Sequence, residues 1–160
     1  MNERHSRMVV RQKLKELGIT LPLPAQPVAN YVPVVVAGGF VVVSGQLPLE
    51  AGKIVVTGKL GENVGIAAGK MAARLCFLNV LGQIDAAIPQ GVEAITQVVR
   101  LGGFIAATPA FVDHAQVMNG ASDLAVELFG AFGQHARSTI GVASLPMNAT
   151  VEIEAMFSIL

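Results

Sequence analysis

The sequence predicts an α+β domain in which two helices pack on one face of a β-sheet. Runs of β-branched residues come first along the chain, and helical and strand-like segments alternate after them. Apolar residues recur at every second position in the strands and at every third or fourth position in the helices. A length of 160 residues is typical of one domain with one hydrophobic core.

The predicted order of strands and helices is βββαβαββ, and it begins after an N-terminal extension. Residues 7–17 are predicted to form a short helix that ends at Gly18, since glycine readily adopts a left-handed conformation. Residues 21–27, LPLPAQP, exclude regular structure because proline lacks a backbone donor. We therefore assign residues 1–28 to an extension with a proline-rich linker and residues 29–160 to the main domain.

The main domain is expected to start with three strands and a long helix. Two β-branched runs in residues 31–48 flank Gly38-Gly39, which is typical of a tight hairpin turn. Residues 52–60 are predicted to supply the third strand. Residues 62–87 are predicted to form a helix that is apolar on most of its surface, so we expect it to be covered on most sides.

The second half of the domain is expected to contain three strands and one more helix. We assign a strand to residues 93–106, an amphipathic helix to residues 111–132, and the last two strands to residues 138–145 and 149–159. A turn over residues 145–149, LPMNA, joins the last two strands. So short a connection predicts that these two strands are antiparallel neighbours.

Strand alternation predicts which way the charged side chains point. In the last strand, Glu152 and Glu154 alternate with a uniformly apolar set that should face the helices. In the preceding strand, Arg137 and Thr139 share one face. If the two strands are neighbours, we expect Arg137 to lie on the same face as the glutamates. That face is either an ordinary solvent-exposed surface or a functional site at a subunit interface, and the residues alone leave both interpretations open.

Composition limits the class of protein. Hydrophobic residues make up 52% and charged residues 14%, so we expect subunit interfaces to bury part of the apolar surface. A formal net charge of zero argues against a nucleic-acid partner, although residues 1–16 are basic. We expect a cytoplasmic location, because no segment is typical of a membrane helix or a signal peptide. Scattered histidines and a single cysteine, Cys76, predict no metal site.

Three segments carry a family resemblance: SGQLP at 44–48, ARSTIGVASLP at 136–146 and VEIEA at 151–155. From about Tyr31 onward, the chain resembles the RidA/YjgF family of reactive-intermediate (enamine/imine) deaminases, also called endoribonuclease L-PSP. NGASDLAVELFG and ANYVP further resemble a longer subgroup that has an N-terminal extension and mostly lacks an assigned activity. The resemblance implies a chorismate-mutase-like fold and a homotrimer whose sheets form a central barrel, with clefts between the subunits.

The resemblance also implies an activity and a set of site residues. The family hydrolyses 2-imino acids such as 2-iminobutanoate and 2-iminopropanoate to 2-keto acids and ammonia, and it needs no cofactor. Arg137 matches the arginine that grips the substrate carboxylate, and Glu152 matches the glutamate that positions or activates water. Three further matched positions line the site: Tyr31, Ser44 and Asn119.

One position departs from the family pattern. Thr139 stands where typical deaminases have cysteine, which changes the shape of the pocket and bears on the substrate it accepts. Whether this chain is an enzyme therefore stays open, and a non-catalytic trimer that binds small carboxylates is a second hypothesis. RNA cleavage is a third hypothesis, which the neutral charge disfavours.

Structural roles for the same residues also stay open. Arg137 could form an ion pair with Glu152 or Glu154, and Tyr31 could be a packed aromatic residue. Asn119-Gly120 has poor helix propensity in the middle of a predicted helix, which suggests a close approach or a polar contact there.

Overall fold

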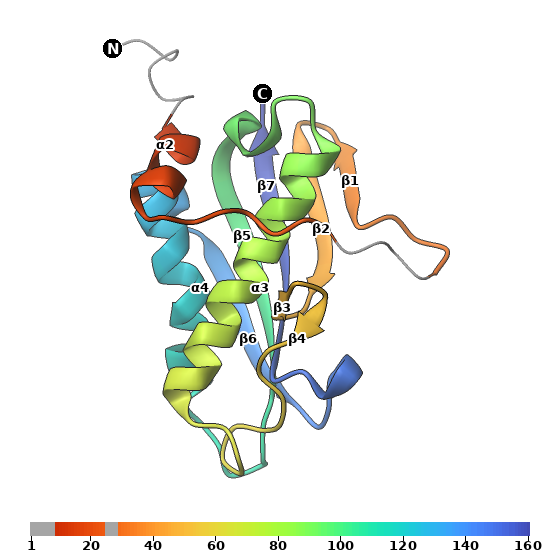
Figure 1. Cartoon of the computed structure of the whole chain (residues 1–160), viewed down its shortest axis with the longest axis vertical. Coiled ribbons are helices and arrows are strands. Elements are labelled where there is room, and N and C mark those ends of the chain that lie inside the picture. The colour runs from red at the N-terminus through yellow and green to blue at the C-terminus, as the bar shows by residue number, and fades with distance from the viewer. Residues whose placement is uncertain (1–8, 25–28) are drawn as a thin grey trace.

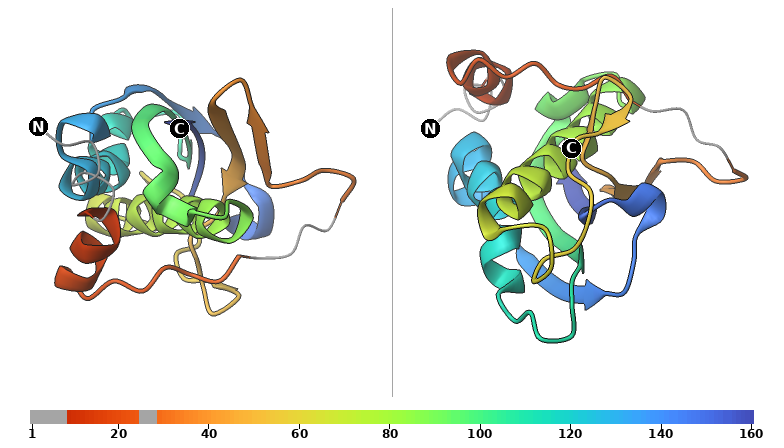
Figure 2. Two further views of the ribbon diagram at one scale, coloured as in Figure 1. Left: turned by 90° about the horizontal axis from the view of Figure 1, so that it is seen from above. Right: turned by 60° about the horizontal axis from the view of Figure 1, so that its bottom comes forward.

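The structure is a computed structural model that describes residues 9–24 and 29–160. Two long helices, α3 (Ile66–Ala87) and α4 (His114–Phe129), lie side by side in front of a five-stranded sheet in Figure 1. Seen from above, both helices lie on the same side of that sheet (Figure 2, left). The predicted α+β class with two helices on one sheet face is therefore confirmed.

The sheet is mixed, and the last strand of the chain lies at its centre. In chain order its strands are β1 (Val34–Ala37), β2 (Phe40–Gln46), β5 (Ile95–Ala106), β6 (Ala136–Val142) and β7 (Val151–Ile159). In space the order is β1-β2-β7-β5-β6. Neighbouring strands are antiparallel except β5 and β6, which run parallel. This order places β6 at one edge of the sheet.

The prediction that the last two strands are neighbours is wrong. β6 pairs with β5, whereas β7 lies between β2 and β5. The connection between them contains a short 3₁₀ turn, Pro146–Asn148, in which Met147 and Asn148 have positive φ. Burial gives the physical reason: every second residue of β7 is buried up to Phe157, whereas no residue of β6 is fully buried. The more apolar strand gains most from the central position.

The predicted third strand is also absent from the main sheet. In residues 52–60, the only strand is β4 (Lys53–Ile54), which pairs with β3 (Leu49–Glu50) in a separate two-stranded ribbon, while Thr57 and Leu60 form isolated β-bridges. Gly52 adopts positive φ and turns the chain between the two short strands. Val56 is nevertheless buried. The β-branched pattern here indicated burial correctly but not strand pairing.

The other predicted elements are present with shifted ends. β1 and β2 form the predicted hairpin, and its turn residues Gly38 and Gly39 have φ values of 56° and 79°. α3 begins at Ile66 because the Lys59 carbonyl accepts backbone N–H groups from the residues just before the helix. α4 ends at Phe129, and a 3₁₀ turn then leads toward β6.

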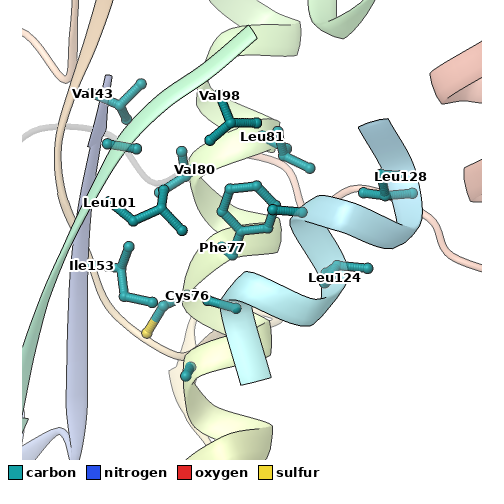
Figure 3. Close-up of a cluster of buried hydrophobic side chains, with 14 of the residues drawn as sticks. Val43, Cys76, Phe77, Val80, Leu81, Val98, Leu101, Leu124, Leu128 and Ile153 are labelled. Carbon is teal, nitrogen blue, oxygen red and sulfur yellow. The ribbon is translucent and has the colours of Figure 1, made fainter. Parts of the chain in front are cut away.

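The hydrophobic core lies between α3, α4 and the sheet. Figure 3 shows Phe77 of α3 facing Leu101 of β5 on one side and Leu124 of α4 on the other. Because the sheet and α4 each cover part of α3, this helix is buried on most of its surface, as predicted. Cys76 is also buried in this core, and burial raises the pKa of its thiol well above the usual value, which keeps it protonated.

The extension contributes a helix, α2 (Val9–Glu16), that packs against α4. Two of its side chains, Val10 and Leu14, belong to the same hydrophobic core. An ion pair of 2.6 Å between Arg11 Nη2 and Asp85 Oδ1 ties α2 to the end of α3. The predicted helix is thus present over the described residues.

Residues 7 and 8 of the predicted helix lie outside the described residues, whereas Gly18 ends the helix with φ 66°, as predicted. The boundary between extension and domain at residue 28 stays a prediction. Over residues 9–24 and 29–160, no helix is long and apolar enough to cross a membrane. The cytoplasmic location stays a prediction.

Candidate functional site

Arg137 lies on the edge strand β6 and points toward helix α4. It pairs in register with Leu101, a core residue, and therefore shares the helix-covered face of the sheet. Its Nη1 donates to Asn119 Oδ1 at 2.8 Å and to Ser122 Oγ at 3.0 Å, and its Nη2 donates to the Ala115 carbonyl at 3.3 Å. All three acceptors come from α4 and none is charged.

The expectation that Arg137 and Glu152 share a face is wrong. Glu152 pairs in register with Phe104, which alternates with the core residues of β5 and lies on the sheet face that carries no helix in the described chain. The alternative role of Arg137, an ion pair with Glu152 or Glu154, is absent too. Among the described residues, Arg137 has no carboxylate within salt-bridge distance, and Glu154 pairs with Arg100 at 3.2 Å. The expectation failed because it rested on β6 and β7 being neighbours.

Glu152 is half-buried beside the β2 strand. Burial raises the pKa of its carboxyl above the ordinary glutamate value, and the nearby Glu154 carboxylate raises this pKa further. The strand pairing of β2 with β7 is irregular between Val43 and Gln46, and Gly45 lies in this irregularity. A Cβ at Gly45 would overlap the Glu152 carboxylate, so a larger residue there would force that side chain to move from its position.

Two other predicted residues lie on the same part of the fold as Glu152. Ser44 precedes Gly45, and its backbone N–H donates to the Pro33 carbonyl at 2.9 Å, which ties the loop before β1 to β2. Its hydroxyl oxygen is buried and has no hydrogen-bond partner among the described residues. Tyr31 lies in that loop with 53% of its surface exposed. The interpretation of Tyr31 as a packed aromatic residue is therefore wrong for the single chain.

Thr139 lies with Arg137 on the helix-covered side of β6. It pairs in register with Gly103, where a Cβ would overlap the Met118 sulfur of α4, so helix and sheet approach closely here. The Thr139 hydroxyl oxygen is buried, and it has no hydrogen-bond partner within the described part of the chain. A polar atom of this kind is costly unless a further group satisfies it.

The predicted site residues thus divide into two groups in a single chain. We call Arg137, Asn119 and Thr139 the arginine half-site; it is built from β6 and α4. We call Tyr31, Ser44 and Glu152 the glutamate half-site; it is built from β2, β7 and the loop before β1. Because the half-sites lie on opposite faces of the sheet, no single chain brings its own two groups together.

Ser122 and His135 complete the surroundings of Arg137, and sequence reasoning predicted neither contact. Ser122 accepts a hydrogen bond from Arg137 and lies 2.9 Å from His135 Nε2. Asn119 and Ser122 are three residues apart, which puts them on one helix face, and this spacing was the available signal. From the sequence, His135 was assigned to a loop next to Arg137, where it could reach the rim of the cleft.

A cavity of about 650 Å³ lies elsewhere on the chain. Its walls come from α2, the end of α4, the start of β5 and the C-terminal residue, and they include Val10, Ile95, Phe132 and Leu160. Neither Arg137 nor Glu152 lines it. The polar groups singled out by the sequence therefore do not converge on this cavity.

Comparison with known proteins identifies the family. Residues 11–159 match the family described as YjgF/chorismate mutase-like, putative endoribonuclease. The chain belongs to the YjgF/chorismate mutase-like family. The match confirms the resemblance carried by the three sequence segments, and it starts earlier than Tyr31, so it includes most of helix α2.

Relatives of this family are similar over nearly the whole chain. Protein TCP17 of Trypanosoma cruzi is 42% identical over 148 residues, which are 92% of each chain. Atu1372 of Agrobacterium tumefaciens, whose crystal structure is described as one of unknown function, is 46% identical with a TM-score of 0.88 over 98% of this chain and 97% of that one. An endoribonuclease-like protein of Shewanella oneidensis is 30% identical with a TM-score of 0.90 over 94% and 99%.

A more distant solved structure shares the fold. TdcF of E. coli, crystallised with bound serine, is 24% identical with a TM-score of 0.59 over 87% of this chain and 94% of that one. The chorismate-mutase-like α+β fold expected from the sequence is thus confirmed for this chain.

Proposed function

We propose that the protein is a homotrimeric enamine/imine deaminase that hydrolyses small 2-imino acids at clefts between its subunits. The observation that carries the proposal is the hydrogen bonding of Arg137. Of the five N–H donors of a guanidinium, the three bonds to α4 leave Nε–H and one hydrogen of Nη2 without a partner among the described residues. This pair of donors suits a two-point contact with a carboxylate.

The charge around Arg137 supports an anionic ligand. Its three partners are an amide oxygen, a hydroxyl and a backbone carbonyl, so none of them neutralises the guanidinium. A half-buried cation without a counterion favours the approach of an anion. The carboxylate of a 2-imino acid, or of its 2-keto acid product, has the matching charge and shape.

The separation of the half-sites supports a site between subunits. The arginine half-site of one copy can meet a glutamate half-site only from another copy, because within one chain they lie on opposite faces of the sheet. The uncovered sheet face also carries exposed apolar side chains that a second copy would bury, including Val35, Val42 and Ile140. A closed ring of three copies would form three equivalent clefts.

In the proposed reaction, Arg137 binds the substrate carboxylate and Glu152 handles water. The ionised Glu152 carboxylate takes a proton from water as the water oxygen forms a bond to the imine carbon. The raised pKa of Glu152 makes this carboxylate a stronger base than an exposed glutamate. Glu152 then passes this proton to the imine nitrogen, which leaves one hydroxyl and one amino group on the former imine carbon. The hydroxyl proton moves to the nitrogen as the C–N bond breaks, so ammonia leaves and a C=O bond remains in the 2-keto acid.

The test is to generate 2-iminopropionate in situ and to follow release of pyruvate with and without the protein. We expect acceleration by the wild type, none by Arg137→Ala, and slow turnover with retained pyruvate binding by Glu152→Gln. Wild-type protein that leaves the rate unchanged with several 2-imino acids would rule out the deaminase proposal.

The second candidate is a trimer that binds small carboxylates without catalysis. Thr139 at the position of the usual cysteine favours it, and the serine bound to TdcF is a carboxylate ligand on a related fold. Under this proposal, wild type binds pyruvate or serine, and Arg137→Ala binds neither ligand. Neither wild type nor any variant accelerates the release of keto acid from the imine.

A further inference from the structure

A chain of polar contacts runs from Arg137 into the turn that precedes β6. Arg137 Nη1 lies 3.0 Å from Ser122 Oγ, and Ser122 Oγ lies 2.9 Å from His135 Nε2. At the far end, His135 Nδ1 lies 2.6 Å from the Gly133 carbonyl oxygen. Every link has hydrogen-bond distance, so the guanidinium is connected to backbone through two side chains.

With a neutral His135 ring, the chemistry of the end groups fixes the direction of every hydrogen bond. A backbone carbonyl only accepts, so His135 Nδ1 must carry a hydrogen and donate it to Gly133. In the neutral ring, Nε2 is then an acceptor, and Ser122 must donate its hydroxyl hydrogen to it. The same hydroxyl accepts from Arg137 with a lone pair. With a neutral His135 ring, donors and acceptors match along the whole chain only in this arrangement.

The far end of the chain is anchored by close packing. Gly133 ends the 3₁₀ turn Gly130–Gly133, and a Cβ at Gly133 would overlap the Ala125 backbone of α4. The carbonyl that receives the His135 hydrogen therefore belongs to a turn pressed against the same helix that carries Ser122. Helix and turn together hold the imidazole in place.

We infer that His135 is a positioning residue for the carboxylate anchor: it holds the Ser122 hydroxyl so that Ser122 accepts from Arg137 and keeps the remaining guanidinium donors aimed outward. The inference rests on the proposed function for what those donors bind. Without an acceptor at His135, the serine hydroxyl is released to bond the carbonyl one turn earlier in α4, as helical serines often do. Arg137 then loses a fixed partner and its orientation loosens.

The first readout is nuclear magnetic resonance, which needs no activity. In ¹⁵N spectra, we expect the wild-type His135 ring to be the Nδ1–H tautomer. We expect a resolved signal from the Arg137 Nη1–H that bonds Ser122 Oγ, assigned by its loss in Arg137→Lys. The signal should broaden through solvent exchange in Ser122→Ala and His135→Phe. It should persist in His135→Gln, whose side-chain oxygen can still accept from Ser122.

The second readout is the dissociation constant for pyruvate. Loss of one neutral hydrogen bond in the chain should weaken binding about three- to tenfold in Ser122→Ala and His135→Phe. The double variant should lose no more than either single variant, because both changes cut the same chain. His135→Gln should restore near wild-type affinity, and Gln134→Ala, an exposed neighbour in the same loop, should not change it. Thermal unfolding verifies that each variant is folded.

The outcomes separate this inference from the proposed function. An Nε2–H tautomer, or an Arg137 signal equally sharp in folded His135→Phe and wild type, overturns the role of His135. Equal pyruvate affinity in His135→Phe and wild type overturns it as well. If wild type neither binds pyruvate nor hydrolyses imines, the proposed function fails, and the Arg137 signal alone still decides whether His135 positions the guanidinium.

Discussion

At the residue scale, Arg137 is held by neutral partners on α4, and no carboxylate in the described part of the chain compensates its charge. A carboxylate partner would hold the side chain as firmly, but it would also cancel the attraction for an anionic ligand. An amide, a hydroxyl and a carbonyl orient the guanidinium and leave its positive charge available. This combination is what an anion-binding site needs from its cation.

Arg137→Lys tests whether the fork of the guanidinium matters beyond its charge. Lysine keeps the positive charge but cannot make two parallel hydrogen bonds to one carboxylate. We expect about 10- to 100-fold weaker pyruvate binding, measured by calorimetry, with an unchanged unfolding midpoint. Full affinity in the lysine variant would show that charge alone is sufficient.

The raised pKa of Glu152 predicts a pH-dependent cost to folding. In the folded chain, burial and Glu154 disfavour the ionised form, so this cost is absent below the ordinary glutamate pKa and grows as pH rises through the raised one. We therefore expect Glu152→Gln to gain stability relative to wild type at about pH 7 and little at about pH 4.

Urea unfolding of both proteins at the two pH values measures this difference. Glu154→Gln is the control. It breaks the 3.2 Å ion pair with Arg100, and it also removes the neighbouring charge that raises the pKa of Glu152. A stability gain in Glu152→Gln that is the same at both pH values would contradict the assigned cause.

At the element scale, the most detailed correct prediction from the sequence concerned helix α4. The awkward pair Asn119-Gly120 predicted a polar contact and a close approach, and both are present: Asn119 accepts from Arg137, and Gly120 lies against the Lys70 backbone. Local propensity was informative here because a tertiary contact overrides it. The identity of the partners depends on how α4 packs on β6, which the spacing within α4 does not encode.

The strand order could not be predicted from local sequence patterns, because it also depends on how separate elements pack. A short turn suggests a hairpin, but the chain after β6 crosses β5 and inserts β7 beside β2. Alternation within each strand correctly separated the apolar face of β7 from Glu152 and Glu154. It could not tell how the faces of β6 and β7 relate, because that depends on which strands pair. The error about a shared face for Arg137 and Glu152 followed from this single missing fact.

The helix crossing at Gly120 gives an element-scale prediction. A Cβ at Gly120 would overlap the Lys70 carbonyl, which is backbone and cannot move aside, so Gly120→Ala should cost about 1–3 kcal/mol of unfolding free energy. Gly69→Ala is the matched control on α3, because its Cβ would meet side-chain atoms of Val117 and Leu60 at 3.1–3.3 Å that can adjust.

Both variants gain the same helix propensity, so their difference isolates the backbone clash. Chemical denaturation of the two variants and wild type measures it. Equal stability of Gly69→Ala and Gly120→Ala would show that the helices separate at little cost.

At the scale of the whole molecule, the divided half-sites predict complementation between chains. Arg137→Ala keeps its glutamate half-site, and Glu152→Ala keeps its arginine half-site. If each cleft takes one half-site from each of two copies, equal mixing in co-expressed oligomers should restore about one quarter of wild-type sites.

The measurement is pyruvate release from 2-iminopropionate by co-purified, differently tagged chains. Each variant alone and an Arg137→Ala/Glu152→Ala double variant are the inactive controls. An inactive mixture that is shown to contain both chains would mean that each cleft uses Arg137 and Glu152 of the same copy.

The uncovered face of the sheet gives a second whole-molecule prediction. Val42 lies on it with 47% of its surface exposed, so Val42→Lys should place a charge in the proposed interface and favour monomers. Met71→Lys is the control, because Met71 is 55% exposed on helix α3, on the other side of the sheet. Light scattering after size exclusion gives the masses, and a Val42→Lys trimer would contradict this interface.

The central position of β7 also has a consequence for how the chain folds. Its pairing with β2 joins residues 40–46 to residues 153–158, more than 100 positions apart along the chain. Closing so long a loop costs entropy before the contact is gained, which slows folding relative to a helical protein of this size. Until that closure, β2 and β5 have unpaired edges and the core lacks Ile153 and Phe157. The partly folded chain can then pair with other chains through these edges. We therefore expect refolding to give the highest yield at low protein concentration.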